Sequence, residues 1–162
     1  DCSYLICGPT AYEALGLEGT TYCAEDLIYQ GNARLENYSD IKNVDEYTRI
    51  EGNLVIAGAA VSTLTLENLR RIDGNLWIWD TGALENFEFA SLEEIGGDIL
   101  IRNNNKLADF GMGKLRSVGG NIAISFNSAL PTCTAEDFTD FVGPGNIVGA
   151  VKIEGNKSDS CE

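Results

Sequence analysis

The chain has 162 residues, of which 44% are hydrophobic and 9% aromatic, a size and composition that suit one domain with a substantial core. Its formal net charge of −14 argues against binding to nucleic acid or to an anionic lipid surface, because both partners select basic surfaces. No run of about 18 apolar residues is present, so we expect no membrane insertion by this chain. The opening residues lack a signal-peptide profile, which favours a processed or trimmed chain.

Residues 1–22 are predicted to form a cap in front of the first repeat. The segment TAYEALGL places Thr10 three residues before Glu13, which is the spacing of a capping box at the start of a short helix. An open solenoid exposes its core at both ends, so a helix at this place would cover the first coil.

Residues 23–130 form a repeat with a period of 22 or 23 residues. The segments EGNLVI (51–56), DGNLWI (73–78), GGDILI (96–101) and GGNIAI (119–124) align, and their Asn or Asp falls at positions 53, 75, 98 and 121. The apolar spacing L-x-x-Φ-x-Φ-x-x-L-x-x-I then occurs three times: Val61, Leu64, Leu66, Leu69, Ile72; Leu84, Phe87, Phe89, Leu92, Ile95; and Leu107, Phe110, Met112, Leu115, Val118. An imperfect copy (26–44) precedes these units and a fading one (145–153) follows them.

This period predicts a mainly β fold, namely a right-handed parallel β-solenoid of about five coils with short capping helices at both ends. A strand is expected at each Leu-x-Ile step, with short extended or irregular sides between the strands. The whole chain, 1–162, is expected to be a single domain, with a cap at 1–22, repeat coils at 23–130 and a C-terminal cap at 131–162 that holds a helix and the last strand.

Two series of residues flank the predicted strands and indicate corners. Glycine precedes the strands at positions 52, 74, 97, 120 and 145, where a positive φ is expected. A second series follows the strands: Asn32, Thr81, Asn104 and Asn127, with a gap near Gly58 and Ala59. Stacked side chains of this kind can satisfy the backbone groups of a tight corner, so we favour a structural ladder over a ligand site.

The segment TAEDFTDFVG is predicted to form a helix that covers the last coil. Thr134 is the expected N-cap, and Gly143 with Pro144 would end the helix. One face of this helix would carry Phe138, Phe141 and Val142.

Five cysteines lie near the two ends of the chain, at Cys2, Cys7, Cys23, Cys133 and Cys161. This placement is typical of disulfides that hold the caps of an extracellular domain. Cys133 with Cys161 is the most economical pair at the rear, while Cys23 can pair with either Cys2 or Cys7. One thiol then stays free or pairs with another chain. The sequence has no histidine and no C-x-x-C motif, which removes the common zinc sites and Cys/His catalytic sites.

Two sequons, at Asn37 and Asn156, agree with secretion and predict glycosylation. Together with the cysteines, they favour an extracellular location, either secreted or at the cell surface.

The GNLxI strands, the repeated apolar spacing, the cysteine in YCAEDLIYQGN and the turns RNNNKL and FNSAL resemble the receptor L domain. That domain is the leucine-rich-repeat-like, ligand-binding solenoid of the insulin and epidermal growth factor receptors. The resemblance covers about residues 22–153, and fungal cell-wall surface proteins have a similar repeat. It implies an extracellular, non-enzymatic binding module that uses the outward face of one sheet.

Strand alternation predicts which side chains form that outward face. With Leu54 and Ile56 and their equivalents, including Leu27 and Tyr29, pointing inward, two outward series remain. They are Ile28, Val55, Trp77, Leu100, Ala123 and Gln30, Ala57, Trp79, Arg102, Ser125. The first series is entirely apolar although it should face solvent, and Trp and Arg are enriched in binding hot spots. The predicted partner-binding residues are therefore Ile28, Val55, Trp77, Trp79, Leu100 and Arg102.

Three explanations for this apolar face remain open. A protein or glycan partner could bind it, with Trp77 as a stacking platform for a sugar. Residues 1–22 or a neighbouring domain could cover it. Copies of the chain could self-assemble into an extracellular filament or wall layer, which an unpaired cysteine would favour.

Catalysis and cofactors are not predicted. Solenoids that cleave polysaccharides need clustered carboxylates on one face, and the outward strand positions hold none apart from Asp80, just past its strand. Neither Asp80 nor Asp109 belongs to an Asp-x-Asp-x-Asp loop, so no metal site is expected. The sequence thus predicts a non-catalytic recognition or adhesion module, with self-assembly as the alternative.

Overall fold

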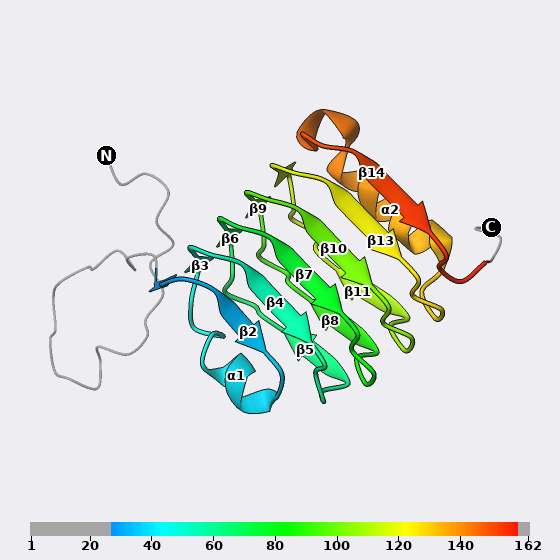
Figure 1. Cartoon of the computed structure of the whole chain (residues 1–162). Coiled ribbons are helices and arrows are strands. Elements are labelled where there is room, and N and C mark those ends of the chain that lie inside the picture. Colours follow the sequence, from blue (N-terminus) through cyan, green and yellow to red (C-terminus); the bar gives the residue numbers. More distant parts are fainter. Residues whose placement is uncertain (1–26, 159–162) are drawn as a thin grey trace, which may run out of the picture.

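The computed structural model describes residues 27–158, which wind into a parallel β-solenoid (Figure 1). The front sheet has six strands: β2 (Ala33–Leu35), β4 (Leu54–Ala57), β7 (Leu76–Trp79), β10 (Ile99–Arg102), β13 (Ile122–Ser125) and β14 (Val151–Glu154). The side sheet has five: β1 (Ile28–Tyr29), β3 (Arg49–Ile50), β6 (Arg71–Ile72), β9 (Glu94–Ile95) and β12 (Ser117–Val118). The back sheet has three: β5 (Thr63–Thr65), β8 (Asn86–Glu88) and β11 (Asp109–Gly111). The mainly β solenoid predicted from the repeat is confirmed.

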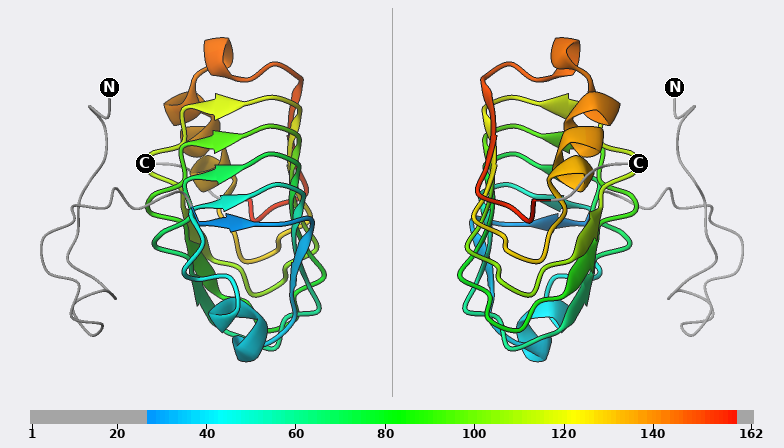
Figure 2. Two further views of the ribbon diagram at one scale, coloured as in Figure 1. Left: turned by 90° about the vertical axis from the view of Figure 1, so that its left-hand side faces the viewer. Right: turned by 90° about the vertical axis from the view of Figure 1, so that its right-hand side faces the viewer.

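The core runs through the centre of the stacked coils. Figure 2 shows this stack of coils from two opposite sides. The apolar residues of the repeat pack there, and all fifteen of the aligned arc positions are buried except Val61 and Phe110, which are partly buried against the same core. Aromatic rings link neighbouring coils: Phe87 stacks on Phe110 with ring centroids 5.3 Å apart. The predicted apolar spacing therefore corresponds to one continuous core.

The first coil differs from the prediction. Strand β1, which contains Ile28 and Tyr29, pairs with β3 in the side sheet, and β2 is the strand that pairs with β4 in the front sheet. Leu27, expected to point inward, is 52% exposed. The correct alignment was present in the sequence, because Gly31 and Asn32 precede β2 as Gly52 and Asn53 precede β4. Ala33 and Arg34 make β2 less apolar than the later strands. The repeat alignment therefore did not identify β2 as the first strand of the front sheet.

The glycines at positions 52, 74, 97 and 120 are required for space, and the predicted positive φ is wrong for them and for Gly145. A Cβ on Gly145 would meet nothing within 4 Å, and Gly149 takes the equivalent place before β14. Positive φ values occur instead at Gly31, Gly58, Gly143 and Gly155. At Gly74, a Cβ would lie 2.5 Å from Oδ1 of Asn53 and 2.7 Å from the carbonyl oxygen of Gly52. Glycine is needed because the side chain of the preceding coil passes directly over it.

Two ladders of polar side chains hold the corners, one before the front sheet and one after it. In the first ladder, each side-chain oxygen accepts from the backbone N–H of the next coil, through Asn32, Asn53, Asn75, Asp98 and Asn121. The second contains Thr81, Asn104, Asn127 and Asn156, and its first three members are buried. The predicted structural ladder is confirmed for Thr81, Asn104 and Asn127, whereas Asn32 belongs to the first ladder.

Helices cover parts of the coils. Helix α1 (Tyr38–Lys42) was not predicted, although Asn37 and Asp40 form a capping box at its start. Helix α2 (Thr132–Val142) begins after Pro131, so Thr134 lies inside the helix and is not its N-cap. Its end at Gly143 is as predicted, and a short 3₁₀ helix, η2 (Pro144–Asn146), follows.

Helix α2 closes the rear part of the core through one of its two predicted phenylalanines. Phe138 is buried and meets the Phe110 ring edge-on, with centroids 5.1 Å apart, whereas Phe141 is 58% exposed. The predicted front helix at 10–17 lies outside the described residues. Within residues 27–158, none of the helices has the length and apolar character that crossing a membrane requires.

Candidate functional site

The three sheets present outward faces of different chemistry. The side sheet carries Arg49, Arg71 and Glu94 in register, and the back sheet carries Thr63, Thr65, Asn86, Glu88 and Asp109. The front sheet instead carries Val55, Trp77, Leu100 and Ala123 in register across β4, β7, β10 and β13. Of the three outward faces in the described part of the chain, only the front one has an apolar centre.

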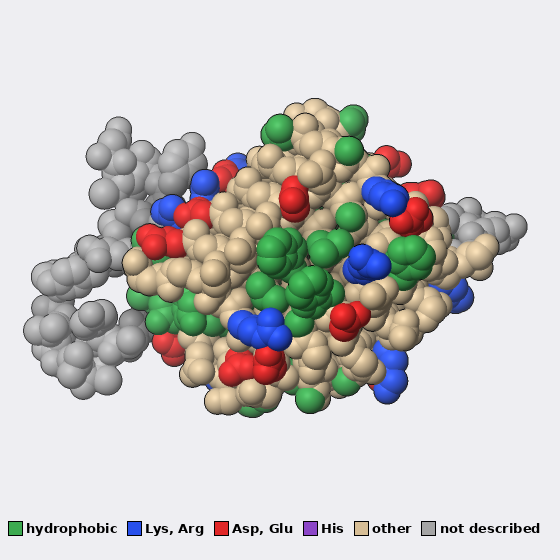
Figure 3. Space-filling view, in the orientation of Figure 1, with side chains coloured by type: hydrophobic (Ala, Val, Ile, Leu, Met, Phe, Trp, Pro, Cys, Tyr) green, Lys and Arg blue, Asp and Glu red, His purple; other side chains and the backbone are tan. Residues whose placement is uncertain are grey.

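We call Val55, Trp77, Trp79, Leu100 and Arg102 the tryptophan face. These five residues are brought together as predicted, with Val55 next to Trp77, and Trp77 next to Leu100. Trp79 is in register with Arg102, which forms the second series. Hydrophobic side chains gather in the middle of this face, with basic and acidic side chains around them (Figure 3).

Ile28 does not belong to the tryptophan face, which corrects the prediction. It lies in β1 of the side sheet, opposite Arg49. The position taken by Ile28 in the predicted series belongs to Arg34, and Lys152 continues the series beyond Ala123 at the other end. The apolar series is therefore bounded by a basic side chain at each end, because the outermost strands are the ones most exposed to water.

The side chains of the tryptophan face partly bury one another. Trp77, Val55 and Leu100 are partly buried, and Trp79 is 37% exposed. The two indole rings lie 6.1 Å apart between centroids with an interplanar angle of 33°. Parallel strands about 4.8 Å apart place equivalent side chains in contact. The apolar area that this face exposes is therefore smaller than the sum of the areas of its separate side chains.

A depression of about 600 Å³ lies beside the tryptophan face, at the corner that follows the front sheet. It is lined by Asp80, Gly82, Arg102, Asn103, Asn105 and Phe126. Gly82, in the coil that contains β7, has no side chain at the position that Asn105 takes in the next coil. A Cβ on Gly82 would meet nothing within 4 Å. Arg102 belongs to both the face and the depression, so the two features are continuous.

The rim of this depression is built from residues with positive φ. Asp80, Asn103 and Phe126 have φ values of 50°, 56° and 56°, and the equivalent corners of the outer coils are Gly58 and Gly155. Gly, Asn and Asp are the usual residues in this conformation, and a bulky residue there costs about 1 to 2 kcal/mol. Phe126 is therefore a strained residue at a corner where glycine would serve.

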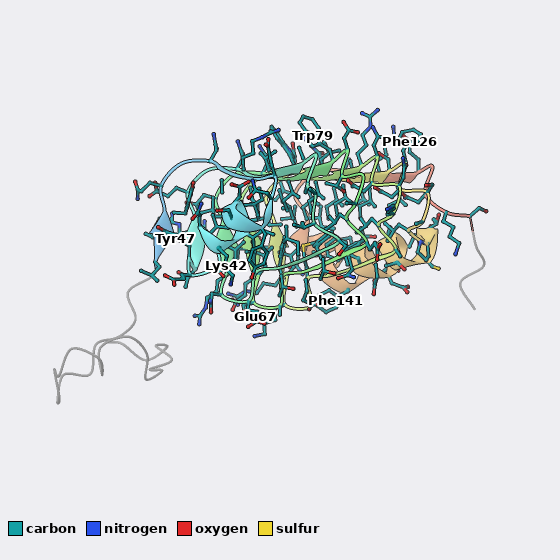
Figure 4. The ribbon with its side chains drawn as sticks, turned by 90° about the horizontal axis from the view of Figure 1, so that it is seen from below. Lys42, Tyr47, Glu67, Trp79, Phe126 and Phe141 are labelled. Carbon is teal, nitrogen blue, oxygen red and sulfur yellow. The ribbon has the colours of Figure 1, made fainter. Side chains whose placement is uncertain are left out.

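Phe126 is held in place but remains accessible. The guanidinium carbon of Arg102 lies 5.6 Å from the centroid of the Phe126 ring, and a Cβ on Gly155 would lie 2.6 Å from Cδ1 of Phe126. Phe126 is nevertheless 46% exposed, and it projects from the same side of the front sheet as Trp79 (Figure 4). Sequence reasoning missed Phe126, although its bulk among Gly, Asp and Asn at equivalent positions was a visible signal.

The charged side chains of the depression differ from those of the side sheet in their ion pairing. Neither Asp80 nor Arg102 forms an ion pair within the described part of the chain. On the side sheet, by contrast, Asp73 accepts from Nε of Arg49 at 2.9 Å and from Nε of Arg71 at 2.6 Å. The hydrogen bond from Arg49 is the main reason that the pKa of Asp73 is lowered. The charges of the side sheet are thus matched internally, while those beside the tryptophan face are available to a ligand.

The two predicted glycosylation sites have different surroundings. Asn37 is exposed, and its Oδ1 accepts from the N–H groups of Ser39 and Asp40 as the N-cap of α1. The Nδ2 of Asn156 donates to the carbonyl oxygen of Ile124 at 2.9 Å, which makes Asn156 the last member of the second ladder. A glycan on Asn37 would extend into solvent, whereas one on Asn156 would compete with the ladder.

Among the predicted disulfide residues, Cys133 lies in the first turn of α2. Cys2, Cys7, Cys23 and Cys161 lie outside the described residues, so their pairing stays a prediction. Residues 27–158 contain no group of three or more Cys, Asp or Glu side chains placed to hold a metal ion. No protein-family model matches this chain, and no curated protein matches its sequence.

Proposed function

We propose that this chain is a non-catalytic recognition or adhesion module that binds a protein or glycan partner through its tryptophan face. The proposal includes an extracellular location, secreted or at the cell surface, and a relationship to the receptor L domain. The repeat spacing, the terminal cysteines and the exposed sequon at Asn37 support this setting.

The observation that carries the proposal is the contrast among the three outward faces. A solenoid sheet that faces only water has no need of two tryptophans, and the side and back sheets carry charged and polar residues instead. Exposed apolar groups rimmed by charges are typical of interaction sites. Trp and Arg, which are adjacent at positions 79 and 102, are the residues most enriched at binding hot spots.

The arrangement of acidic groups supports a role without catalysis. Glycoside cleavage requires a pair of carboxylates on either side of the scissile bond. The depression beside the tryptophan face contains one carboxylate, that of Asp80. Binding is therefore the chemistry that its lining suits.

Self-assembly is the second candidate, and the rear edge of the front sheet favours it. Strand β14 pairs with β13 on one side and is the outermost strand of its sheet. Val148 and Val151 are exposed beside this edge. An exposed edge strand is a template for pairing with another chain, although Lys152 and Glu154 on β14 are the kind of charged residues that discourage it.

The test compares a face variant with a control on another sheet. The face variant carries Trp77→Ala and Trp79→Ala, and the control carries Thr65→Ala and Asn86→Ala on the back sheet. Immobilised proteins would be exposed to a panel of purified secreted proteins, neutral polysaccharides and anionic polysaccharides, after circular dichroism has shown that each variant is folded. We expect at least one panel member to bind the wild-type chain and the control, and to lose affinity for the face variant by about 100-fold.

Equal binding by the face variant and the wild-type chain would contradict the proposal, as would a complete absence of binding across the panel. Light scattering with and without reductant separates the second candidate from the first. A chain that is monomeric under both conditions would exclude self-assembly.

A further inference from the structure

We infer that the depression beside the tryptophan face is a subsite for a neutral oligosaccharide of pyranose rings. One sugar ring would occupy the depression, and a neighbouring ring would lie on Trp79. This inference rests on the proposed function, because it gives the class of ligand for the same surface.

The polar lining of the depression suits sugar hydroxyl groups. Asp80 supplies a carboxylate that accepts hydrogen bonds, Arg102 supplies donors in a planar fork, and Asn103 and Asn105 supply amides that do both. Adjacent hydroxyls on a pyranose ring need such paired donors and acceptors. All four side chains are planar and lie on neighbouring coils, so their spacing is set by the strand register.

The aromatic groups suit the apolar faces and edges of a sugar ring. Phe126 forms one wall of the depression, and Trp79 lies on the adjacent strand position, next to Arg102. Figure 4 shows that both rings project from the same side of the sheet. The negative face of an aromatic ring attracts the C–H groups of a pyranose, because these carry partial positive charge.

The strain at Phe126 favours a role in binding over one in folding. Equivalent corners are formed by Gly58 and Gly155, which adopt the same backbone conformation without strain. A phenylalanine at this position projects a partly exposed ring over the depression. The contacts with Arg102 and Gly155 fix its orientation before any ligand arrives, which reduces the entropy lost on binding.

Charge favours a neutral sugar over an acidic one. The depression contains one negative group, Asp80, and one positive group, Arg102, so its own charge balances. The chain as a whole carries a formal net charge of −14, which repels anionic polysaccharides. Protein partners of this depression are disfavoured because four of its six lining residues present polar side chains.

The length of the site favours an oligosaccharide over a single sugar. Trp79 and Ser125, which precedes Phe126, are two strand steps apart, or about 10 Å. Arg102 lies between them in the register. This separation accommodates two successive rings, one against each aromatic side chain.

Intrinsic fluorescence provides a direct readout, because the chain has two tryptophans and both lie on the tryptophan face. The full chain would be titrated with cellotetraose, laminaritetraose, chitotetraose and mannotetraose, and with tetragalacturonate as the anionic comparison. We expect a saturable change in tryptophan emission with at least one neutral oligosaccharide at millimolar concentration or below. Tetragalacturonate is expected to give no such change.

Three variants test the assignment of residues. Asp80→Asn keeps the shape of the side chain, and asparagine tolerates the positive φ at this position. Phe126→Gly introduces the residue that the equivalent corners have at Gly58 and Gly155. Both should weaken binding by about ten-fold or more, and Phe126→Gly should melt at the wild-type temperature or above it. Phe141→Ala removes an exposed phenylalanine from α2 on the opposite side of the molecule (Figure 4) and should change neither property.

The inference is overturned if no neutral oligosaccharide gives a saturable signal, if tetragalacturonate binds best, or if Asp80→Asn and Phe126→Gly bind as the wild-type chain does. A lower melting temperature for Phe126→Gly, with unchanged binding by Asp80→Asn, would assign Phe126 a structural role. These failures are distinct from failure of the proposed function. If a panel protein binds through Trp77 and Trp79 while none of the oligosaccharides binds, the oligosaccharide subsite is rejected. The proposed binding role of the tryptophan face is then retained.

Discussion

The side-chain amide of Asn104 donates to Oδ1 of Asn127 in the next coil at 3.1 Å, and both side chains are completely buried. The same amide also donates to the carbonyl oxygen of Ile78 at 3.0 Å. Oδ1 of Asn104 accepts from the hydroxyl of Thr81 at 2.6 Å and from its N–H group at 3.1 Å. One asparagine thus links three successive coils, because its side chain bonds to polar groups in the coil on either side of its own.

Asn104→Ala should therefore destabilise the fold strongly. The substitution leaves the buried N–H and hydroxyl of Thr81 and the carbonyl oxygen of Ile78 without these partners, and each such group costs about 1 to 3 kcal/mol. We expect a loss of about 4 kcal/mol in the free energy of unfolding, measured by urea denaturation. Asn86→Ala, at an exposed position of β8, should change it by less than about 0.5 kcal/mol. Similar losses for the two variants would show that the ladder is not a stabilising element.

Gly74→Ala tests the close approach between coils. Its Cβ would lie 2.5 Å from Oδ1 of Asn53, so the first polar ladder must shift, and overpacking of this kind costs about 1 to 3 kcal/mol. Gly113→Ala is the matched control, since its Cβ would meet nothing within 4 Å and its φ is not positive. Thermal melting should separate the two variants clearly. A Gly74→Ala protein as stable as the Gly113→Ala protein would contradict the steric explanation.

Asp73 should contribute to the pH dependence of stability. Its pKa is lowered from the ordinary value of 3.8, first by the hydrogen bond from Arg49 and also by Arg71. A lowered pKa means that the stabilisation is fully present above about pH 4 and is lost as pH falls through the lower value of the folded state. Asp73→Asn should reduce stability by about 1 kcal/mol at neutral pH and make the acid-side loss less steep.

Asp137→Asn is the control for this measurement, because Asp137 is exposed on α2. Unfolding by urea would be followed at pH 7, 5, 4 and 3. Parallel stability curves for the wild-type chain and Asp73→Asn would contradict the role assigned to the Arg49 and Arg71 ion pairs.

The two sequons should behave differently when the chain is expressed in a secretory host. We expect a glycan on Asn37 and none on Asn156 in the folded protein, because the Asn156 amide is committed to the carbonyl oxygen of Ile124. Intact mass analysis of Asn37→Gln and Asn156→Gln distinguishes the sites. Loss of the glycan mass in Asn156→Gln, with none in Asn37→Gln, would reverse the assignment.

The repeat spacing was enough to predict most of the fold. Leu76 and Ile78 point inward and Trp77 and Trp79 outward as expected, because strand alternation and a fixed period together leave one register. The first coil was misplaced because Ala33 and Arg34 weaken the apolar pattern of β2, although Gly31 and Asn32 mark its start. Spacing alone also could not distinguish a glycine needed for positive φ from one needed for space, since this depends on the neighbouring coil.

The candidate site was predictable in part. Five of the six predicted binding residues lie together on the front sheet, and their binding role stays a prediction. The depression was not foreseen, because it depends on the missing side chain at Gly82 and on the direction given to Phe126 by its backbone. The residue type at a repeat position predicts neither the space left at Gly82 nor the direction of the Phe126 side chain.

Acrylamide quenching of tryptophan fluorescence, with and without a ligand that binds the wild-type chain, tests directly whether the ligand covers the tryptophan face. Both tryptophans of the chain lie on the tryptophan face, so quenching reports the accessibility of that surface alone. A ligand that covers the face should lower the quenching constant by about half or more. An unchanged quenching constant at saturating ligand would place the binding surface elsewhere on the molecule and rule out the tryptophan face as the binding site.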